Sequence, residues 1–532
     1  MSDDDGTWWR EGVIYQIYVR SFADTNGDGF GDLQGVIEHL DHLEWLGVDG
    51  VWLSPIHPSP DRDWGYDVAG YLGVHPELGD LETLDRLVAD ARTRGIRVIL
   101  DLVPNHTSDL HPWFVDARSS MDATHRELYV WREPRPDGSP PNNWLSVFGG
   151  PAWELDEPTG QYYLHNFLPE QPDLDWWNDG VREEFEGILR FWFDRGIAGF
   201  RIDVANALIK DRALRDNDPA AEDDPEEVRR RGQRFIYNQN RPEVHEIYRR
   251  WRTIADSYEP RRILIGETWI FDLREVSRFY GETGDELDLC FNFPFVFGAF
   301  EAESLRAAVE AAEAALAPFA QPTWAASNHD VGRFATRWCG DRSDAARCAL
   351  LALLCLRGTP FLYYGDEIGM VEVEVTGDAV RDRAGLVGGA QPGRDPGRTP
   401  MQWNADRGAG FTRPDTRPWL PIGDARAINV ADQRSDPGSM LRLCRDLIAL
   451  RRETLDLRSG RYTSLPSPAG AWAWRRGGDI IVAVNLSDEP SSIPIGAATI
   501  AIGTRRDRDG EPVEGALSLG PWEGAILRVA PS

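Results

Sequence analysis

The sequence predicts an α/β protein, a (β/α)8 TIM barrel with an inserted loop-rich domain after strand 3 and a C-terminal antiparallel β domain. Three observations support this expectation. Short apolar segments alternate with segments of helical period, and eight such units occur along most of the 532 residues. A stretch rich in Trp, Pro, Gly and Asn interrupts the alternation after the third unit. Short segments of period two end the chain.

The predicted strands are short and apolar, and strand–helix alternation is typical of parallel strands joined by right-handed crossovers. They cover Gly12–Val19, Gly50–Ser54, Ile96–Val103, Gly199–Val204, Ile263–Trp269, Leu287–Phe293, Thr323–Asn328 and Thr359–Gly365. Helices with apolar residues every three or four positions cover Val36–Leu46, Leu81–Arg94, Val181–Asp194, Pro242–Tyr258 and Met440–Arg452. The polar stretch from about 207 to 235 predicts a loop or a small helical excursion.

These elements divide the chain into three predicted domains. Residues 1–104 and 181–454 form the barrel, and residues 105–180 form the inserted domain. Residues 455–532 alternate in short segments separated by Gly, Pro and Asp, and predict a C-terminal β-sandwich-like domain.

The composition restricts the class of protein. A net charge of −30 argues against nucleic-acid and anionic-membrane partners, which favour basic surfaces. The five cysteines form no C-x-x-C pair and predict buried free thiols of a reducing compartment. No basic region followed by an apolar run opens the chain, and no apolar stretch has transmembrane length. We expect a cytoplasmic protein, either a monomer or a homodimer.

The fourth predicted strand carries a charged pair. Arg201 and Asp203 stand two residues apart, so on a strand they point to the same side. Two interpretations are open: a salt bridge on a strand edge, or a pair facing one cavity. In the second, the arginine would hold Asp203 ionised at neutral pH.

Acidic residues follow or end several predicted strands, where barrel active sites gather. Asp101, Asp203 and Glu267 end the third, fourth and fifth strands, and Asp330 follows the seventh. Each alone could be a capping or ladder residue, but four converging on one mouth favour carboxylate chemistry. Retaining glycoside hydrolysis needs an ionised nucleophile and a protonated acid, and neighbouring negative charge would raise the pKa of Glu267 for the second role. A serine triad is disfavoured because no G-x-S-x-G occurs.

Four stretches in this order resemble the signature regions of the α-amylase superfamily, glycoside hydrolase family 13. They are Asp101-Leu-Val-Pro-Asn-His106, Gly199-Phe-Arg-Ile-Asp203, Gly266-Glu-Thr268 and Ser327-Asn-His-Asp330. Gln171-Pro-Asp-Leu174 resembles a fifth signature in the form of oligo-1,6-glucosidases and α-glucosidases. The resemblance implies a retaining enzyme in which Asp203 is the nucleophile, Glu267 the general acid/base and Asp330 a stabiliser of the transition state. It also implies that a bound glucose is surrounded by His106, Arg201 and His329.

Further matches imply where the end of the sugar lies. Gly65-Tyr66-Asp67 is similar to a loop in which Asp67 binds the 4- and 6-hydroxyls and Tyr66 stacks on the ring. The stretch from Gly393 to Trp403 resembles RD-x-x-RTPMQW, and either Arg394 or Arg398 would contact the sugar. Three other residues match positions that line the pocket, namely Phe148, Phe167 and Gln171; for the two phenylalanines the alternative is core packing.

A loop after the first strand carries oxygen donors at alternate positions and glycines for tight turning, a pattern that suits Ca²⁺. It lacks the terminal Glu of an EF-hand, and the family has a similar calcium loop. The predicted ligands of a structural Ca²⁺ are Asp24, Asn26, Asp28, the Phe30 carbonyl and Asp32. The alternative is a loop closed by its own Asx turns.

The resemblance therefore implies an exo-acting α-glucosidase that hydrolyses short α-glucosides from the non-reducing end, with transglucosylation. In relatives, valine after the nucleophile goes with α-1,6 cleavage and alanine or threonine with α-1,4; this chain has Val204 but departs from the usual continuation. We expect α-1,4 substrates of maltose type. The alternatives are an oligo-1,6-glucosidase, or a glucosyl transferase of the trehalose synthase or sucrose isomerase type.

Overall fold

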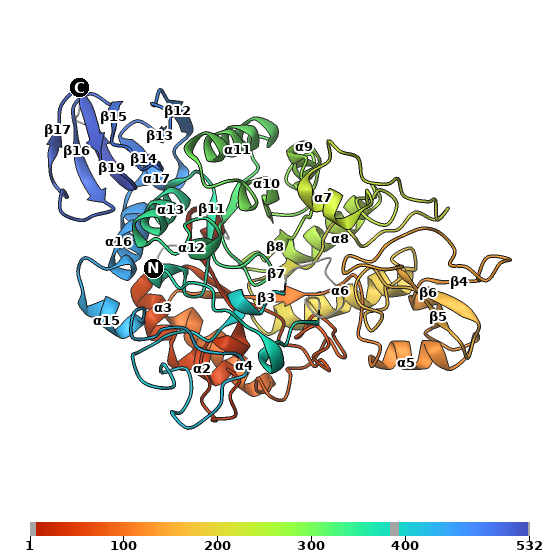
Figure 1. Cartoon of the computed structure of the whole chain (residues 1–532). Helices are drawn as coiled ribbons and strands as arrows, with labels where there is room; N and C mark the ends of the chain where they lie inside the picture. Colours follow the sequence, from red (N-terminus) through yellow and green to blue (C-terminus); the bar gives the residue numbers. More distant parts are fainter. Residues whose placement is uncertain (1–6, 384–392, 530–532) are drawn as a thin grey trace.

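The structure is a computed structural model that describes residues 7–383 and 393–529. Figure 1 shows a central barrel, with a three-stranded sheet on one side and two antiparallel sheets near the C-terminus on the other. The predicted fold class is confirmed. None of the helices within the described ranges combines the length and apolar composition of a membrane span.

The barrel consists of eight parallel strands. They are β1 Ile14–Ile17, β2 Gly50–Leu53, β3 Arg97–Leu102, β7 Gly199–Ile202, β8 Ile263–Gly266, β9 Leu289–Cys290, β10 Thr323–Ala325 and β11 Thr359–Tyr363. Their hydrogen-bonded order is β10-β11-β1-β2-β3-β7-β8-β9, so neighbours in the barrel follow one another along the chain. Each predicted strand is present, and all eight are shorter than predicted.

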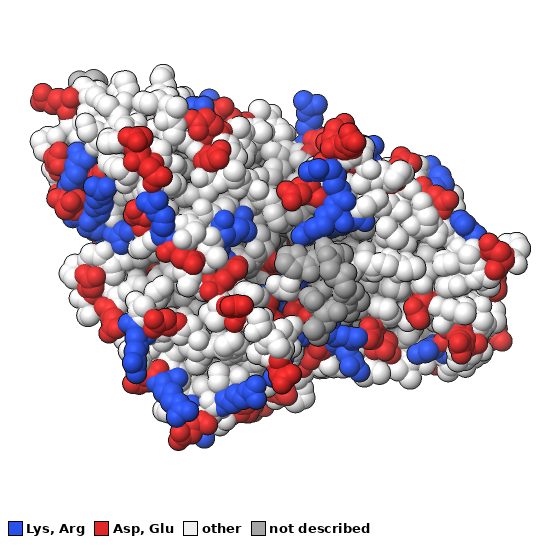
Figure 2. All heavy atoms as spheres, in the orientation of Figure 1, with Lys and Arg blue, Asp and Glu red and all other residues white. Residues whose placement is uncertain are grey.

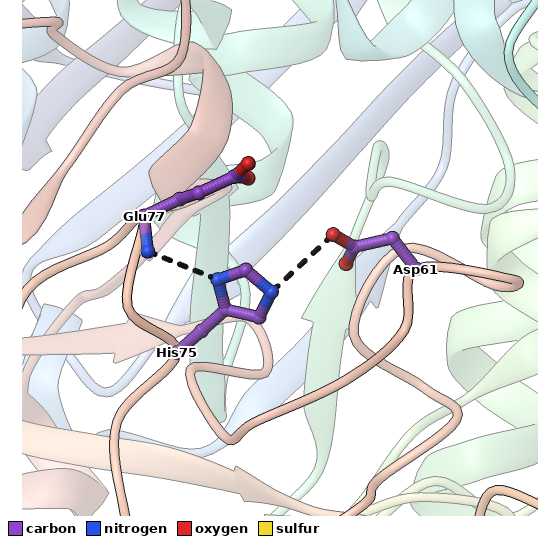
Figure 3. Close-up of side chains that lie close together, drawn as sticks. All are labelled: Asp61, His75 and Glu77. Carbon is purple, nitrogen blue, oxygen red and sulfur yellow. Dashed lines mark hydrogen bonds and ion pairs between the residues drawn. The ribbon is translucent and has the colours of Figure 1, made fainter. Parts of the chain in front are cut away.

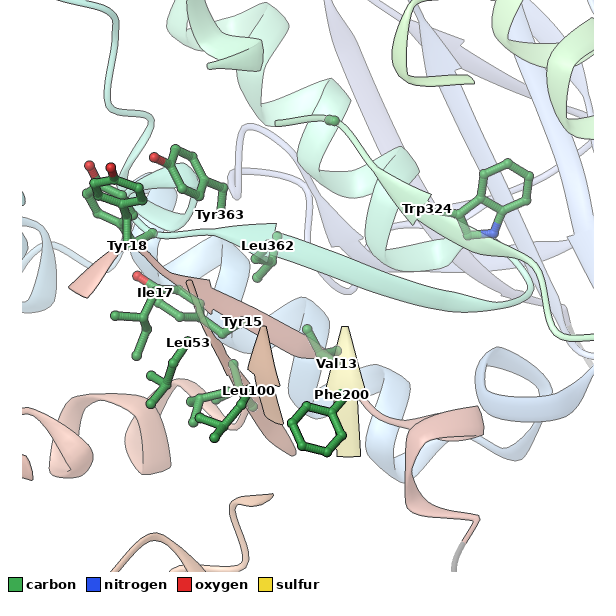
Figure 4. Close-up of a cluster of buried hydrophobic side chains, with 14 of the residues drawn as sticks. Val13, Tyr15, Ile17, Tyr18, Leu53, Leu100, Phe200, Trp324, Leu362 and Tyr363 are labelled. Carbon is green, nitrogen blue, oxygen red and sulfur yellow. The ribbon is translucent and has the colours of Figure 1, made fainter. Parts of the chain in front are cut away.

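Alternate residues of the strands face opposite sides, as a period of two requires. Tyr15, Leu100 and Phe200 pack outward in the large core between strands and helices, part of which Figure 4 shows. Ile14 and Ile99 belong to a separate apolar cluster with residues of the other strands. Polar residues two positions further along these strands are therefore carried to the same interior, at its C-terminal end.

Gly199 illustrates how closely the strands approach. A Cβ atom at this position would lie 2.4 Å from the Ile263 carbonyl oxygen and 2.4 Å from its Cγ1. A larger residue would push β7 away from β8. The glycine therefore supports the close approach of the two strands that carry Arg201 and lead to Glu267.

The helices surround the barrel and connect its strands. They are α1 Trp8–Glu11, α2 Leu33–Glu38, α3 Leu40–Leu46, α4 Leu81–Thr93, α5 Pro112–Ser119, α6 Asp179–Asp194, α7 Glu226–Arg231, α8 Val244–Asp256, α9 Leu273–Arg278, α10 Phe293–Val296, α11 Ala302–Ala315, α12 Phe334–Arg337, α13 Ser343–Cys355, α15 Val430–Ser435, α16 Met440–Glu453 and α17 Leu455–Ser459. The predicted helix from Val36 to Leu46 starts earlier and is interrupted at His39, whose ring Nδ1 lies 2.8 Å from the Gly35 carbonyl.

The insertion after β3 contains the α-helix α5, the short 3-10 helix η2 Arg126–Leu128 and an antiparallel sheet. Its strands are β4 Trp131–Arg132, β5 Trp153–Asp156 and β6 Gln161–Leu164, in the order β4-β6-β5. Lys210, after β7, reaches back to this region: its Nζ lies 2.7 Å from Asp173 Oδ2 and donates to Asn105 Oδ1 at 2.7 Å. These buried contacts help to hold the insertion over the mouth of the barrel.

The C-terminal region is antiparallel, as predicted. Its strands are β12 Tyr462–Leu465, β13 Ala471–Arg476, β14 Ile480–Asn485, β15 Ser491–Pro494, β16 Ala498–Gly503, β17 Pro512–Val513, β18 Ala516–Leu519 and β19 Glu523–Val529. The six-stranded sheet β12-β13-β14-β19-β16-β17 shares an apolar core with the pair β15-β18, which is a sandwich arrangement. Arg476 Nη1 donates to the Cys355 carbonyl at 2.7 Å and ties this domain to α13.

Surface charge and thiols also bear on the predictions. In the face drawn in Figure 2, acidic and basic side chains occur together over the barrel and the C-terminal region. The prediction of no nucleic-acid partner rests on the net charge of −30 and stays a prediction. All five cysteines are free and buried, as predicted.

Candidate active site

One arginine gathers three carboxylates at the C-terminal end of the barrel. Arg201 Nη1 lies 2.8 Å from Asp101 Oδ1 and 2.6 Å from Asp203 Oδ1, and Nη2 lies 2.7 Å from Glu267 Oε1. The strand register explains the arrangement, since Arg201 pairs with Asp101 across β3 and β7, and Ile202 pairs with Gly266 across β7 and β8. The pair therefore faces an interior cavity; it is not an edge salt bridge.

This cluster is buried, and burial controls its protonation. Burial raises the pKa of Asp203 well above its usual range although Arg201 opposes the shift. Burial also raises the pKa of Asp101 to about 6 and raises that of Glu267, for which Asp330 adds to the shift. The expected lowering of the Asp203 pKa by Arg201 is present but smaller than the effect of burial. A single guanidinium does not balance three carboxylates, so each carboxylate favours the neutral form of its neighbours.

Asp330 has a different environment. Its Oδ1 accepts hydrogen bonds from Arg394 Nη1 and Arg398 Nη2, each at 3.0 Å, and its Oδ2 lies 3.1 Å from His329 Nε2. Burial alone would raise the pKa of Asp330, but these contacts hold it well below its usual range. Asp330 is thus held as the anion beside carboxylates that burial favours in the neutral form.

The carboxylates open into a pocket at the mouth of the barrel. Eight predicted residues line it: Tyr66, His106, Phe148, Phe167, Asp203, Glu267, Asp330 and Arg394. Four others lie behind these, fully or almost fully buried: Gln171, Arg201, His329 and Arg398. The arginine that lines the pocket is therefore Arg394, while Arg398 supports it from behind, with Nε donating to the His329 carbonyl at 2.8 Å.

The structure does not bring Asp67 into the pocket. Its Oδ1 accepts from the Ser59 hydroxyl and the Asp63 N–H, and its Oδ2 accepts from the Arg62 N–H, at 2.7, 3.0 and 2.8 Å. The carboxylate closes its own loop, and burial raises its pKa to about 6. Physically, an acid that accepts bonds from the backbone of its own turn has little freedom to turn towards a ligand.

Asp63, at the other end of the same loop, occupies the pocket wall instead. Its Oδ1 accepts from Arg394 Nη2 at 2.6 Å and its Oδ2 accepts from Gln171 Nε2 at 3.1 Å. Gln171 Nε2 also lies 3.2 Å from His106 Nε2. The stretch Asp63-Trp-Gly-Tyr-Asp67 carries an acid at each end, and the resemblance implied the second one, Asp67.

Several other lining residues were not among the predicted site residues. They are Val147, Arg231, Gln239 and Trp269; Val204, singled out as the position on which linkage depends, lines the pocket as well. Arg231 and Trp269 also line an adjoining hollow with Phe235 and Phe271. The Arg231 guanidinium carbon lies 5.4 Å from the ring centroids of both Phe235 and Trp269. Arg231 and Phe235 come from the excursion around α7, and Trp269 and Phe271 come from the loop after β8; the sequence pattern does not determine the course of either segment.

In the predicted calcium loop, every side-chain oxygen accepts at least one hydrogen bond. Asp24 accepts from the N–H groups of Gly27 and Gly29, and Asp32 accepts from that of Gly35, where it caps α2. These bonds are those of the self-closed alternative. Yet among the described residues, neither Asp24 nor Asp32 has a lysine or arginine nitrogen within 4 Å, although both are buried. Each oxygen retains lone pairs, so the donor set also fits a cation.

A second group of possible ligand atoms lies elsewhere in the described structure. Asp61, His75 and Glu77 converge, with His75 Nε2 3.3 Å from Asp61 Oδ2 (Figure 3). Arg20 already binds both carboxylates, Asp61 at 2.6 Å and Glu77 at 3.1 Å. The arginine balances their charge, and we interpret the group as a support for the loop that carries Asp63.

The fold and the site define an enzyme that works by carboxylate chemistry at the mouth of a (β/α)8 barrel. The comparisons with known proteins make this specific: the family described as "Alpha amylase, catalytic domain" matches residues 16–460, and the chain belongs to it. The predicted resemblance to the α-amylase superfamily is confirmed. The protein is a glycoside hydrolase of its α-glucosidase branch.

Three similar proteins illustrate the likeness. A probable alpha-glucosidase of Rhizobium meliloti (strain 1021) is 41% identical over 508 residues, 92% of this chain and 91% of the relative. An oligo-1,6-glucosidase of Heyndrickxia coagulans is 36% identical over 530 residues, 91% of this chain and 93% of the relative. The crystal structure of the alpha-glucosyl transfer enzyme XgtA has a TM-score of 0.91 and 37% identity, covering 98% of this chain and 99% of that one.

Proposed function

We propose that the protein is a retaining, exo-acting α-glucosidase that releases glucose from the non-reducing ends of short α-glucosides such as malto-oligosaccharides, maltose and sucrose. Hydrolysis proceeds through a glucosyl intermediate on Asp203. The same relatives and architecture fit a cytoplasmic monomer or homodimer, which we retain as part of the proposal.

One observation carries the exo assignment. The pocket wall contains the ion pair between Asp63 and Arg394, and Arg394 is fixed further by Asp330 and by Asp382, whose Oδ1 is 2.7 Å away. Asp63 and Arg394 therefore present charged hydrogen-bonding groups to the pocket, separate from the carboxylates that bind Arg201. Carboxylate and guanidinium together suit the terminal hydroxyls of one glucose, and their mutual bond blocks extension of the chain on that side.

The proposed first step transfers glucose to the protein. Glu267 donates its proton to the glycosidic oxygen while an Asp203 oxygen attacks the anomeric carbon; the bond from that carbon to the leaving group breaks, and the alcohol departs. In the second step Glu267 removes a proton from water, and the resulting hydroxide oxygen displaces Asp203. Two displacements retain the anomeric configuration. Both carboxylates bind one guanidinium, which holds them at short range from each other.

The surrounding groups support these charge changes. The raised pKa of Glu267 favours the proton that the first step needs. Arg201 balances Asp203 when that residue is the anion. Asp330, held ionised by its contacts with His329 and the two arginines, stabilises the positive charge that develops on the sugar ring.

For linkage we propose α-1,4 bonds, with α-1,6 as the alternative. Val204 lines the pocket, so the residue that separates the two preferences in relatives is in place to touch the substrate. The α-1,6 alternative is favoured by valine itself and by the oligo-1,6-glucosidase relative. The α-1,4 assignment rests on the sequence after Val204, which departs from the oligo-1,6-glucosidase pattern.

Transfer is the second candidate activity, and the adjoining hollow favours it. The hollow meets the pocket at Arg231, Gln239 and Trp269, next to the acid Glu267, where a leaving group or an acceptor would lie. Aromatic faces there can hold a sugar ring as acceptor in place of water. An enzyme with this wall would give transglucosylation products at high substrate concentration.

We also propose that the loop from Asp24 to Asp32 binds a structural Ca²⁺. The support is the alternate spacing of its oxygens together with two buried carboxylates that have no basic partner within 4 Å among the described residues. Asp24, Asn26, Asp28, Asp32 and the Phe30 carbonyl would be the ligands. The ion would add charge balance and stiffness to the loop after β1.

A product time course by NMR tests the function. Maltose, isomaltose, sucrose and trehalose are each incubated with the enzyme, and the anomeric signals are followed from the first turnover. We expect α-glucose as the first product, with maltose consumed faster than isomaltose. Initial release of β-glucose would contradict the retaining mechanism, and preferential cleavage of isomaltose would establish the α-1,6 alternative.

A further inference from the structure

A buried glutamine on the first barrel strand contacts a site histidine. Gln16 in β1 is 1% exposed, and its Nε2 lies 2.8 Å from His329 Nδ1 and 3.3 Å from the Ser54 hydroxyl. None of the roles given above uses this residue. The contact joins the first strand to the loop after β10, on the interior side of the barrel.

The contacts of His329 determine where its ring carries a proton. Nε2 lies 3.1 Å from Asp330 Oδ2, a carboxylate held ionised, and such an oxygen can only accept. Nε2 is therefore protonated. Burial lowers the pKa of His329 to about 4, so the ring is neutral at pH 7 and Nδ1 is unprotonated. An unprotonated Nδ1 needs a donor, and the amide of Gln16 supplies it.

From this starting point a chain of hydrogen bonds leads to the nucleophile, with Asp101 accepting from both of its neighbours. The one Nε2–H of His329 is shared between Asp330 Oδ2 and the Tyr66 hydroxyl oxygen, 2.6 Å from Nε2, and that hydroxyl donates to Asp101 Oδ2 at 2.8 Å. Asp101 Oδ1 in turn accepts from Arg201 Nη1, which also donates to Asp203 Oδ1. The Tyr66 and His329 rings are parallel within 1°, with centroids 5.2 Å apart. Every link is buried, so water does not compete with it.

We propose that Gln16 is a positioning residue that fixes the Nε2–H tautomer of His329 and thereby orients the Tyr66–Asp101–Arg201 chain that holds Asp203. Reversing the tautomer would leave two acceptors, His329 Nε2 and Asp330 Oδ2, facing each other. It would also remove the donor to the Tyr66 oxygen. The inference rests on the proposed role of Asp203, but its structural part does not depend on activity.

The direct test is nitrogen NMR of the enzyme labelled with ¹⁵N-histidine, without substrate. Protonated and unprotonated ring nitrogens differ strongly in ¹⁵N chemical shift. The spectrum of a His329→Asn variant identifies the signals of His329 among those of the ten histidines. Between pH 6 and 8 we expect His329 with a protonated Nε2 and an unprotonated Nδ1. A protonated Nδ1 in this range would overturn the proposal, whatever the enzyme's substrate.

Two variants then separate positioning from packing. Gln16→Glu replaces the donor by an acceptor, so we expect His329 to be protonated at Nδ1. We also expect kcat to be lower by about tenfold or more, and the acidic side of the pH profile of kcat/KM to shift. Gln16→Met keeps the side-chain volume but has no donor, so we expect a smaller loss of kcat and an unchanged pH profile of kcat/KM. Gln321→Glu is a matched control, since Gln321 is also buried but precedes β10 at the opposite end of the barrel.

The outcomes of the variants are decisive in both directions. A Gln321→Glu enzyme with normal kcat, beside a Gln16→Glu enzyme with the changes described, supports the proposal. A Gln16→Glu enzyme that keeps both the wild-type kcat and the wild-type pH profile overturns it. If the nucleophile assignment alone were mistaken, the His329 tautomer and its change in Gln16→Glu would be as expected, while covalent trapping would label a residue other than Asp203.

Discussion

The substitution Asp63→Asn tests the closed end of the pocket. It keeps the shape of the side chain and removes its charge, while Arg394 retains Asp382 and Asp330 as partners. A hydrogen bond from a sugar hydroxyl to a charged group contributes about 1.5–3 kcal/mol. Because Asp63 is to bind the terminal glucose in the transition state, we expect kcat/KM to fall by between about tenfold and about 150-fold.

Asp67→Asn is the matched comparison, four residues away on the same loop. The carboxylate of Asp67 accepts two backbone N–H bonds on different oxygens, and an asparagine oxygen could satisfy one of the two donors. An unpaired buried N–H costs about 1–3 kcal/mol, so we expect a lower melting temperature. Since Asp67 does not line the pocket, kcat/KM of the folded enzyme should stay within about threefold of wild type.

The assay is initial-rate hydrolysis of maltose by purified proteins, with thermal melting of the same preparations. The expected pattern is an active but less stable Asp67→Asn enzyme and a folded but impaired Asp63→Asn enzyme. The reverse pattern, with the large loss of kcat/KM in Asp67→Asn, would show that the loop changes conformation when substrate binds. It would refute the assignment of Asp63.

Three further predictions concern catalysis, metal and pH. Asp203→Asn and Glu267→Gln should each lower kcat by about 10³-fold or more with melting temperature little changed, measured by rate and melt; near-normal turnover in either would contradict the proposed roles. Treatment with EDTA should lower the melting temperature and leave activity at low temperature little changed, as expected for a structural ion. An unchanged melting temperature would contradict the Ca²⁺ proposal. Burial raises the pKa of Asp366 to about 7. The folded state therefore binds more protons there than the unfolded state between about pH 4 and 7, and stability from this group falls as pH rises. Asp366→Asn should lose this dependence on pH. Between about pH 4 and pH 8 its free energy of unfolding should rise relative to that of wild type by on the order of 4 kcal/mol. A difference in melting temperature between the two proteins that is independent of pH would refute the raised pKa.

The barrel could be predicted because the pattern of each strand and helix lies within a short stretch of the sequence. Each strand is a short apolar segment beside a helix of clear period, and the connections between parallel strands leave few topologies. The interruption at His39 could not be predicted, because it depends on a ring nitrogen that approaches the Gly35 carbonyl inside an apolar helical pattern. The small sheet of the insertion was likewise hidden in a stretch of irregular composition.

The candidate site was predictable where strand ends determine it. Asp203, Glu267 and Arg201 follow from register, since parallel strands bring their carboxyl ends to one edge. The choice between Asp63 and Asp67 depends on how one turn closes on itself, which residue types alone do not decide. The contact between Gln16 and His329 joins residues 313 positions apart, and a single sequence carries no signal for it.

The central claim is the covalent intermediate on Asp203, and trapping tests it most directly. A fluorinated α-glucosyl fluoride reacts by the first displacement and slows the second, so that the glucosyl–enzyme accumulates. Mass spectrometry of the intact protein and of its peptides then locates the added sugar. The account predicts one fluoroglucosyl group per chain, on the peptide that contains Asp203. A label on another carboxylate, or complete turnover with no adduct under conditions that release fluoride, would contradict it.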